Sequence, residues 1–203
     1  RHSHPKGKAR EQGPVEKFRQ YLFPCGVLPG KCGMWGQPDP YTPGDTAKKS
    51  MLVSTGAEAV ENAIKIARAA TGRSAIISTT GAFHGRTMMG MALTGKVAPY
   101  KAGFGPFPPE IFHAAYPNPY HGVTVDAALD ALNALFRADV DPSRVAAIIF
   151  EPVQGEGGFN IAPVEYLQAV RKICDAHGIL LIMDEIQTGF ARTGKMFATE
   201  YAG

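Results

Sequence analysis

From Thr42 onward, short apolar segments alternate with longer segments in which apolar residues recur at helical spacing. The predicted strands are residues 51–53, 75–78, 145–150 and 179–183. The predicted helices are residues 55–71, 125–137 and 163–177. Strands and helices that alternate along a chain usually form a parallel sheet with helices packed on its faces. The sequence therefore predicts an α/β fold with a mostly parallel sheet.

The ends of two predicted helices carry recognisable signals. Thr55 and Glu58 have the spacing of a capping box, and Gly72 follows the last residue with helical spacing. Pro163 near a first turn and Gly178 just past an end delimit the third helix in the same way.

Residues 1–41 have a different character. They are rich in glycine, proline and basic residues, and their apolar residues follow neither the helical nor the strand period. We expect residues 1–41 to be irregular and poorly ordered, and residues 42–203 to form the folded part.

Composition excludes several classes of protein. Only 19% of the residues are charged, the net charge is +3, and residues 6–10 are the one short basic cluster, so nucleic-acid binding is not expected. The apolar runs are too short for a membrane span, and the N-terminus is too polar for a signal peptide. Cys25, Cys32 and Cys174 do not have the number or spacing of a disulfide framework or a zinc site. These features predict a cytoplasmic protein without a metal site and without a membrane partner.

A turn of small residues, 54–57, joins the first predicted strand to the first helix. Free N–H groups at such a helix start bind phosphate, although a plain helix cap explains the same residues. Residues 189–195 read G-F-A-R-T-G-K and match a nucleotide-binding loop, but Met196 stands where a serine or threonine would hold magnesium, so we interpret them as a surface turn.

Three carboxylates follow predicted strands. Asp184 ends the strand 179–183, where ligands bind in open α/β sheets, although a helix cap or a local salt bridge is the alternative. Glu151 and Glu156 lie on the glycine-rich loop after the strand 145–150. Two carboxylates on such a loop could serve acid–base chemistry, bind a metal or simply be solvated. The loop 81–87 adds an aromatic ring, an imidazole and a guanidinium, which together suit a ligand with a flat ring and a carboxylate.

Taken together, these segments resemble the class III, fold-type I aminotransferases that use pyridoxal 5′-phosphate, and most closely the bacterial 4-aminobutyrate aminotransferases. The similar stretches begin at Thr42 (TPGDTAKKSMLVSTGAEAVENAIKIARAATGR), Gly81 (GAFHGRTMMGMALTGKVAPYKAGFGPFP), Ala146 (AAIIFEPVQGEGGF) and His177 (HGILLIMDEIQTGFARTGKMFA). The resemblance implies part of the family's large domain, with the sheet incomplete. We find no such resemblance in residues 1–41.

The resemblance also implies which residues hold the cofactor. Gly56 and Ala57 would bind its phosphate, with alanine standing where many relatives have serine. Phe83, in the family's aromatic-His-Gly motif with His84, would stack on the pyridine ring.

The strand-end motif would supply the remaining cofactor contacts. Asp184 would pair with the ring nitrogen and keep it protonated, which lets the ring accept electrons. Ile186 would pack beneath the ring, and Gln187 would donate to the ring hydroxyl.

For substrates, the resemblance implies an amino acid and a 2-oxo acid. Arg86 would receive the far carboxylate of an ω-amino acid, and Glu156, with Glu151 beside it, would pair with an arginine from another part of the enzyme. Transfer of an amino group to 2-oxoglutarate within a homodimer is then the expected activity. Ornithine or acetylornithine as the amino donor is an alternative, and a non-catalytic phosphate or nucleotide binder is an alternative of another class.

The family's Schiff-base lysine has no counterpart among the lysines of the similar stretches. Lys96, Lys101 and Lys195 do not match its position. The resemblance predicts that this lysine lies beyond Gly203 and that the chain is a fragment.

Overall fold

The computed structural model describes residues 42–44, 48, 50, 51 and 53–203. The chain divides into two compact units, and every helix and strand below belongs to the unit formed by residues 41–43 and 51–203. The expectation that residues 1–41 are poorly ordered lies outside the described residues.

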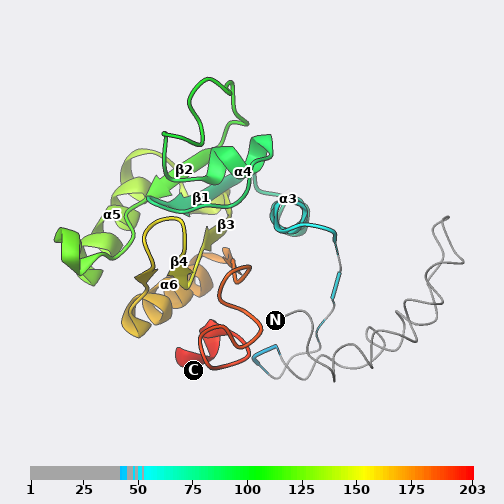
Figure 1. Cartoon of the computed structure of the whole chain (residues 1–203). Coiled ribbons are helices and arrows are strands. Elements are labelled where there is room, and N and C mark those ends of the chain that lie inside the picture. The colour runs from blue at the N-terminus through cyan, green and yellow to red at the C-terminus, as the bar shows by residue number, and fades with distance from the viewer. Residues whose placement is uncertain (1–41, 45–47, 49, 52) are drawn as a thin grey trace, which may run out of the picture. The chain divides into compact units, whose positions relative to one another are not determined.

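A four-stranded parallel sheet forms the centre of this unit (Figure 1). Its strands are β1 (Ala75–Thr79), β2 (Ile111–Ala114), β3 (Val145–Phe150) and β6 (Leu180–Met183). The spatial order is β2-β1-β3-β6, and each neighbouring pair is parallel. The predicted α/β class is therefore confirmed.

Three helices begin and end close to the predicted residues. They are α3 (Gly56–Thr71), α5 (Val125–Ala138) and α6 (Val164–His177). At the start of α3, the Thr55 side chain accepts from the Glu58 amide while the Glu58 carboxylate accepts from the Thr55 amide, as the capping box predicts. Gly72 and Gly178 adopt the left-handed conformation that ends α3 and α6.

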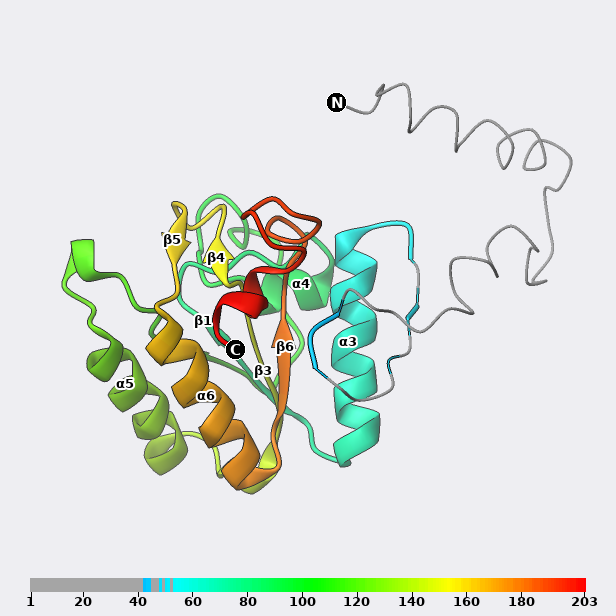
Figure 2. The same cartoon turned by 90° about the horizontal axis from the view of Figure 1, so that it is seen from below.

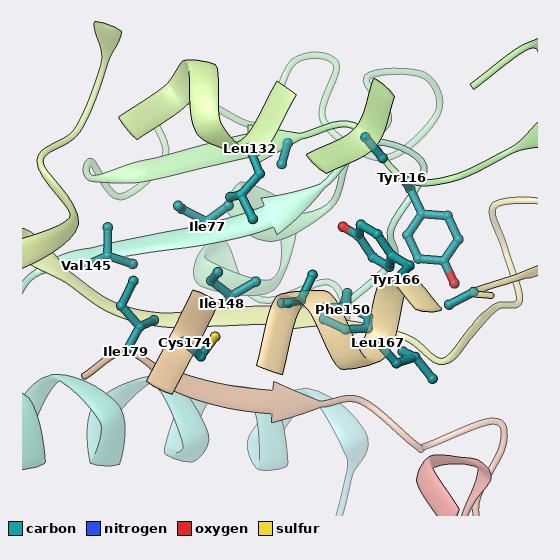
Figure 3. Packing of buried hydrophobic residues seen from close by; sticks show 14 of the residues in the cluster. Ile77, Tyr116, Leu132, Val145, Ile148, Phe150, Tyr166, Leu167, Cys174 and Ile179 are labelled. Atoms are coloured by element: carbon teal, nitrogen blue, oxygen red, sulfur yellow. The ribbon is translucent and has the colours of Figure 1, made fainter. Parts of the chain in front are cut away.

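Helices cover both faces of the sheet, with α5 and α6 on one side and α3 and α4 (Met88–Leu93) on the other (Figure 2). Side chains alternate along each strand, so Ile77 and Ile148 join the cluster under α5 and α6, whereas Ile76 and Ile149 join the cluster under α3 and α4. Figure 3 shows the first cluster, in which side chains of α5 and α6 point toward β1 and β3.

Some predictions about secondary structure were wrong. Residues 51 and 53 do not form a strand, and residue 52 lies outside the described residues. β2 and α4 were not predicted. The predicted strand 179–183 corresponds to β6, which lies last in the strand order of the described residues, with Leu180 40% exposed.

The remaining elements are short. They are the antiparallel pair β4 (Val153–Gln154) and β5 (Asn160–Ile161) and the 3-10 helices η1 (Pro119–His121), η2 (Pro142–Arg144) and η3 (Ala198–Tyr201). Within the described part of the chain, no helix combines the length and apolar character that crossing a membrane requires.

Candidate functional site

The loops after β1, β3 and β6 meet the start of α3 beyond the C-terminal ends of the strands. Because the strands are parallel, their C-terminal ends lie together there, and α3 begins at the same edge because it leads back to the start of β1. A cavity of about 230 Å³ lies among these segments, and its lining residues are Gly56, Ala57, Phe83, His84, Gly85, Glu151, Asp184, Ile186 and Gln187. The residues that the sequence suggested for cofactor binding are thus brought together.

Asp184 is a buried carboxylate with a fixed orientation. His84 Nδ1 lies 2.8 Å from its Oδ2 atom, and the Ile186 amide donates to its Oδ1 atom at 3.1 Å. Since a carboxylate only accepts hydrogen bonds, the proton of the first contact belongs to His84 Nδ1. The other ring nitrogen of His84, Nε2, is buried and has no hydrogen-bond partner among the described residues.

The start of α3 presents free backbone donors to the cavity. The amides of Gly56 and Ala57 have no acceptor among the described residues. Gly85 packs directly against this turn at a φ of +107°, and a Cβ atom there would lie 3.0 Å from the Ala57 Cβ. The first turn of a helix with unpaired N–H groups carries partial positive charge, so this part of the cavity suits a phosphate.

Glu151 holds two loops of the site together. Its buried carboxylate accepts from the Phe83 amide at 2.9 Å and from the Gly155 amide at 3.1 Å. Burial raises the pKa of Glu151, although these two hydrogen bonds act in the opposite direction. Glu151 therefore positions the loop that carries Phe83.

Glu156, which the sequence grouped with Glu151, has a different environment. Its side chain is exposed, does not line the cavity, and accepts a hydrogen bond from the Tyr100 hydroxyl at 2.9 Å. The Tyr100 ring in turn packs on Phe83, with centroids 5.0 Å apart. Arg86 is exposed nearby and makes no hydrogen bond or ion pair with any described residue.

The loop after β6 places Ile186 and Gln187 beside the cavity. Ile186 is 58% exposed, and its side chain lies so close to Gly56 that a Cβ atom there would be 2.6 Å from Ile186 Cδ1. The Glu185 carboxylate accepts four hydrogen bonds, from the Thr188 hydroxyl and from the amides and one hydroxyl of residues 198–199, and so fixes this loop.

Sequence reasoning missed Gly85, Tyr100 and Glu185. Glu185 directly follows Asp184, and its acidic character next to a strand end was the only available signal. Tyr100 lies on an irregular loop, where neither spacing nor periodicity points to a role.

A larger hollow of about 450 Å³ lies at the N-terminal ends of the strands, and its lining residues include Arg68, Arg73 and Arg144. Arg73 donates to three backbone carbonyls, Arg68 donates to another, and Arg144 pairs with Glu110 at 2.6 Å. These contacts give the arginines structural roles. In the described part of the chain, no group of three or more potential metal ligands occurs.

The chain is similar to known proteins over its whole length. Residues 38–203 match the family model described as aminotransferase class-III. The chain is 50% identical over 202 residues to a 5-aminovalerate aminotransferase of Pseudomonas putida, covering 100% of this chain and 48% of that protein. It is 46% identical over 212 residues to the 4-aminobutyrate aminotransferase of Escherichia coli, covering 100% of this chain and 47% of that protein. Both matches reach into residues 1–41, where the motifs alone had shown no resemblance.

A solved structure is similar as well. The taurine:2-oxoglutarate aminotransferase of Bifidobacterium kashiwanohense, in complex with pyridoxal phosphate and glutamate, matches with a TM-score of 0.86 and 30% identity, covering 98% of this chain and 46% of that one. The chain spans about half the length of the curated relatives that it matches.

Proposed function

The chain belongs to the class III aminotransferases, and on this premise we propose that it forms the cofactor-binding part of an enzyme that transfers an amino group from an ω-amino acid to 2-oxoglutarate. The observation that carries the proposal is the cavity where Asp184, the first turn of α3 and Phe83 meet. The amino donors that we favour have four or five carbons, because similar proteins are 4-aminobutyrate and 5-aminovalerate aminotransferases.

The residues around the cavity fit pyridoxal phosphate. The unpaired amides of Gly56 and Ala57 suit its phosphate, and the buried Asp184 carboxylate suits a protonated ring nitrogen. Phe83 and the exposed Ile186 side chain offer apolar surface for a flat ring, and Gln187 offers an amide for the ring hydroxyl. When bound, the cofactor supplies an electron sink for the substrate carbon that loses its proton.

Within this part of the enzyme, Asp184 holds a proton at the ring nitrogen. The Asp184 carboxylate has one orientation because His84 and the Ile186 amide each donate a hydrogen bond to one of its oxygens. His84 is a positioning residue in this proposal, since it contacts Asp184 through Nδ1. Preorganised contacts of this kind stabilise charge without rearranging during the reaction.

Arg86 would receive the carboxylate of the ω-amino acid. Its guanidinium is exposed and unpaired among the described residues, and it lies on the same loop as Phe83. A planar guanidinium binds a carboxylate through two parallel hydrogen bonds, which also orients the substrate. We further propose that the full-length enzyme is a cytoplasmic homodimer, as the sequence resemblance implies.

The test uses the full-length enzyme loaded with pyridoxal phosphate. Glutamate formation from 2-oxoglutarate is measured with 4-aminobutyrate, 5-aminovalerate, ornithine and N-acetylornithine as amino donors. The proposal predicts the highest kcat/KM for one of the first two donors, and a large rise of its KM in Arg86→Ala. A preference for ornithine or acetylornithine would contradict the proposed donor class, and tight nucleotide binding without glutamate formation would favour a non-catalytic binder.

A further inference from the structure

The side chain of Gln187 lines the cavity but makes no hydrogen bond to another described residue. A glutamine side chain that no contact holds in place loses rotational freedom when it binds a ligand, which costs free energy. Gln187 can therefore bind a ligand well only if packing keeps its amide group in place.

Gly155, on the loop after β3, provides this packing. If a Cβ atom were added to Gly155, the three nearest atoms outside its chain neighbours would all belong to the Gln187 amide group, with Nε2 at 2.7 Å and Oε1 and Cδ nearer still. Cβ atoms in proteins essentially never lie within 3.0 Å of such atoms. The Gln187 amide thus occupies the space that any side chain at position 155 would need.

The backbone of Gly155 is fixed, and it does not itself require glycine. The Gly155 amide donates to the Glu151 carboxylate at 3.1 Å, and the Gly155 carbonyl accepts from the Gly158 amide at 3.1 Å. Gly158 has a φ of +122° and a Cβ atom there would meet nothing nearer than 3.9 Å, whereas the φ of Gly155 lies outside the left-handed region. Backbone conformation explains the glycine at 158, and the Gln187 amide explains the glycine at 155.

We propose that Gly155 is a positioning residue for the cofactor, because the room that it leaves holds the Gln187 amide where its NH2 group can donate to the ring hydroxyl of pyridoxal phosphate. The amide oxygen of Gln187 lies nearer to Gly155 than the nitrogen does, so the donor group is the part of the amide farther from this loop. The inference rests on the proposed function, in which the cavity holds pyridoxal phosphate.

The test uses the full-length enzyme without its cofactor and compares two ligands. Pyridoxine 5′-phosphate has the ring hydroxyl but no aldehyde, so it binds without a covalent bond. Its 3-deoxy analogue lacks the ring hydroxyl. The ratio of the two dissociation constants, measured by calorimetry, reports the contact with the hydroxyl, whereas a general loss of stability would weaken the binding of both ligands.

Four variants are compared with the wild type. Gly155→Ala introduces the overlap, Gln187→Ala removes the amide, and the double variant Gly155→Ala/Gln187→Ala has neither. Gly157→Ala is the matched control on the same loop. A Cβ atom at Gly157 would also overlap, at 2.6 Å from the carbonyl oxygen of Gly81, but none of its three nearest atoms belongs to Gln187.

The wild type should bind pyridoxine 5′-phosphate about 2- to 12-fold more tightly than the deoxy analogue, the factor that one hydrogen bond of ordinary net strength accounts for. This preference should disappear in Gly155→Ala and in Gln187→Ala, and Gly157→Ala should keep it. In the Gln187→Ala background, adding Gly155→Ala should change neither dissociation constant, because the overlap no longer exists.

A wild type without the preference, a preference that survives in Gly155→Ala, or an equal loss of preference in Gly157→Ala would each overturn the inference. If Gly155→Ala alone does not fold, the double variant should fold, and its failure to fold would also overturn the inference. A wild type that binds neither ligand would overturn both proposals. A wild type that prefers the hydroxyl compound but forms no glutamate from any ω-amino acid would contradict the proposed function alone.

Discussion

At the scale of single residues, the site depends on one buried carboxylate whose oxygens are both engaged. His84 and the Ile186 amide leave the Asp184 carboxylate a single orientation toward the cavity. An asparagine at this position would keep the size, but its NH2 group would meet a donor, either His84 Nδ1 or the Ile186 amide.

We therefore expect Asp184→Asn in the full-length enzyme to nearly abolish transamination. Loss of a hydrogen bond to a charged group costs about 1.5–3 kcal/mol, so pyridoxal phosphate should bind about 10- to 150-fold more weakly. Fluorescence titration of the cofactor and a glutamate assay measure the two effects. Asp175→Asn is the control, since Asp175 lies in an exposed ion pair on α6. Near-normal turnover in Asp184→Asn would refute the role of Asp184.

Glu151 leads to a prediction about pH. Burial raises its pKa above 4.5, so the native chain keeps the Glu151 proton to a higher pH than the unfolded chain does. The native state thus binds more protons in the window from 4.5 up to the raised pKa, and the free energy of unfolding falls as pH rises through this window.

The measurement compares urea unfolding of the wild type and Glu151→Gln at pH 4.5, the ordinary pKa of the group, and at neutral pH. Glutamine has one acceptor oxygen for two amides, so the variant should be less stable at both pH values. The gap between the two proteins should be larger at the lower pH. A gap that stays constant, or grows toward neutral pH, would show that burial does not govern this carboxylate.

At the scale of elements, the helices that could be predicted from the sequence were the long ones with recognisable cap residues. α3 and α6 were predicted because cap residues and apolar spacing agree over 16 and 14 residues. α4 has six residues, which is too short for the helical period to stand out. Residues 51–53 were apolar enough for a strand, but an apolar run of three cannot be distinguished from loop.

The loop after β6 offers a prediction of its own. Glu185 accepts four hydrogen bonds, two of them from the first amides of η3, and it precedes the cavity residues Ile186 and Gln187. Glu185→Gln keeps one acceptor oxygen and should displace this loop. We expect a loss of about 0.5–2 kcal/mol in the free energy of unfolding, typical of a lost cap, together with weaker binding of pyridoxal phosphate.

Glu200→Gln is the matched control, because Glu200 caps the same 3-10 helix through the Phe197 amide at 2.7 Å but does not adjoin the cavity. Urea unfolding and cofactor titration are measured on both variants of the full-length enzyme. Equal cofactor affinity in the two variants would mean that Glu185 only stabilises the loop.

At the scale of the whole molecule, two of the residues proposed to hold the cofactor lie at the ends of regular elements, so their meeting could be predicted from the topology. Asp184 ends a strand, and Gly56 begins a helix, so parallel topology brings them to one edge. The different environments of Glu151 and Glu156 could not be predicted, since both lie on the same loop and only its path buries one and exposes the other. Tyr100 reaches the site from a loop without regular structure, whose course depends on contacts distant in sequence.

The last prediction concerns the 203-residue chain itself, which we expect to bind pyridoxal phosphate without a covalent bond. No lysine of the described residues lines the cavity. The Nζ atoms of Lys101 and Lys195 donate instead to the carbonyls of Ala92 and Glu200, at 3.1 and 2.8 Å. The proposed contacts of the cofactor with the α3 amides, the Phe83 ring and Asp184 would remain, because none of them involves the cofactor's aldehyde.

The measurement compares pyridoxal phosphate with 4′-deoxypyridoxine phosphate, which lacks the aldehyde. The two dissociation constants should agree within about two-fold, equivalent to less than 0.5 kcal/mol. Borohydride treatment followed by mass spectrometry of the intact chain should show no stoichiometric adduct. Labelling of one lysine per chain, or much weaker binding of the deoxy compound, would place a reactive lysine at the cavity and overturn the prediction. A covalent bond to a lysine would strengthen the binding of pyridoxal phosphate but not that of the deoxy compound. Equal dissociation constants therefore indicate that no such bond forms.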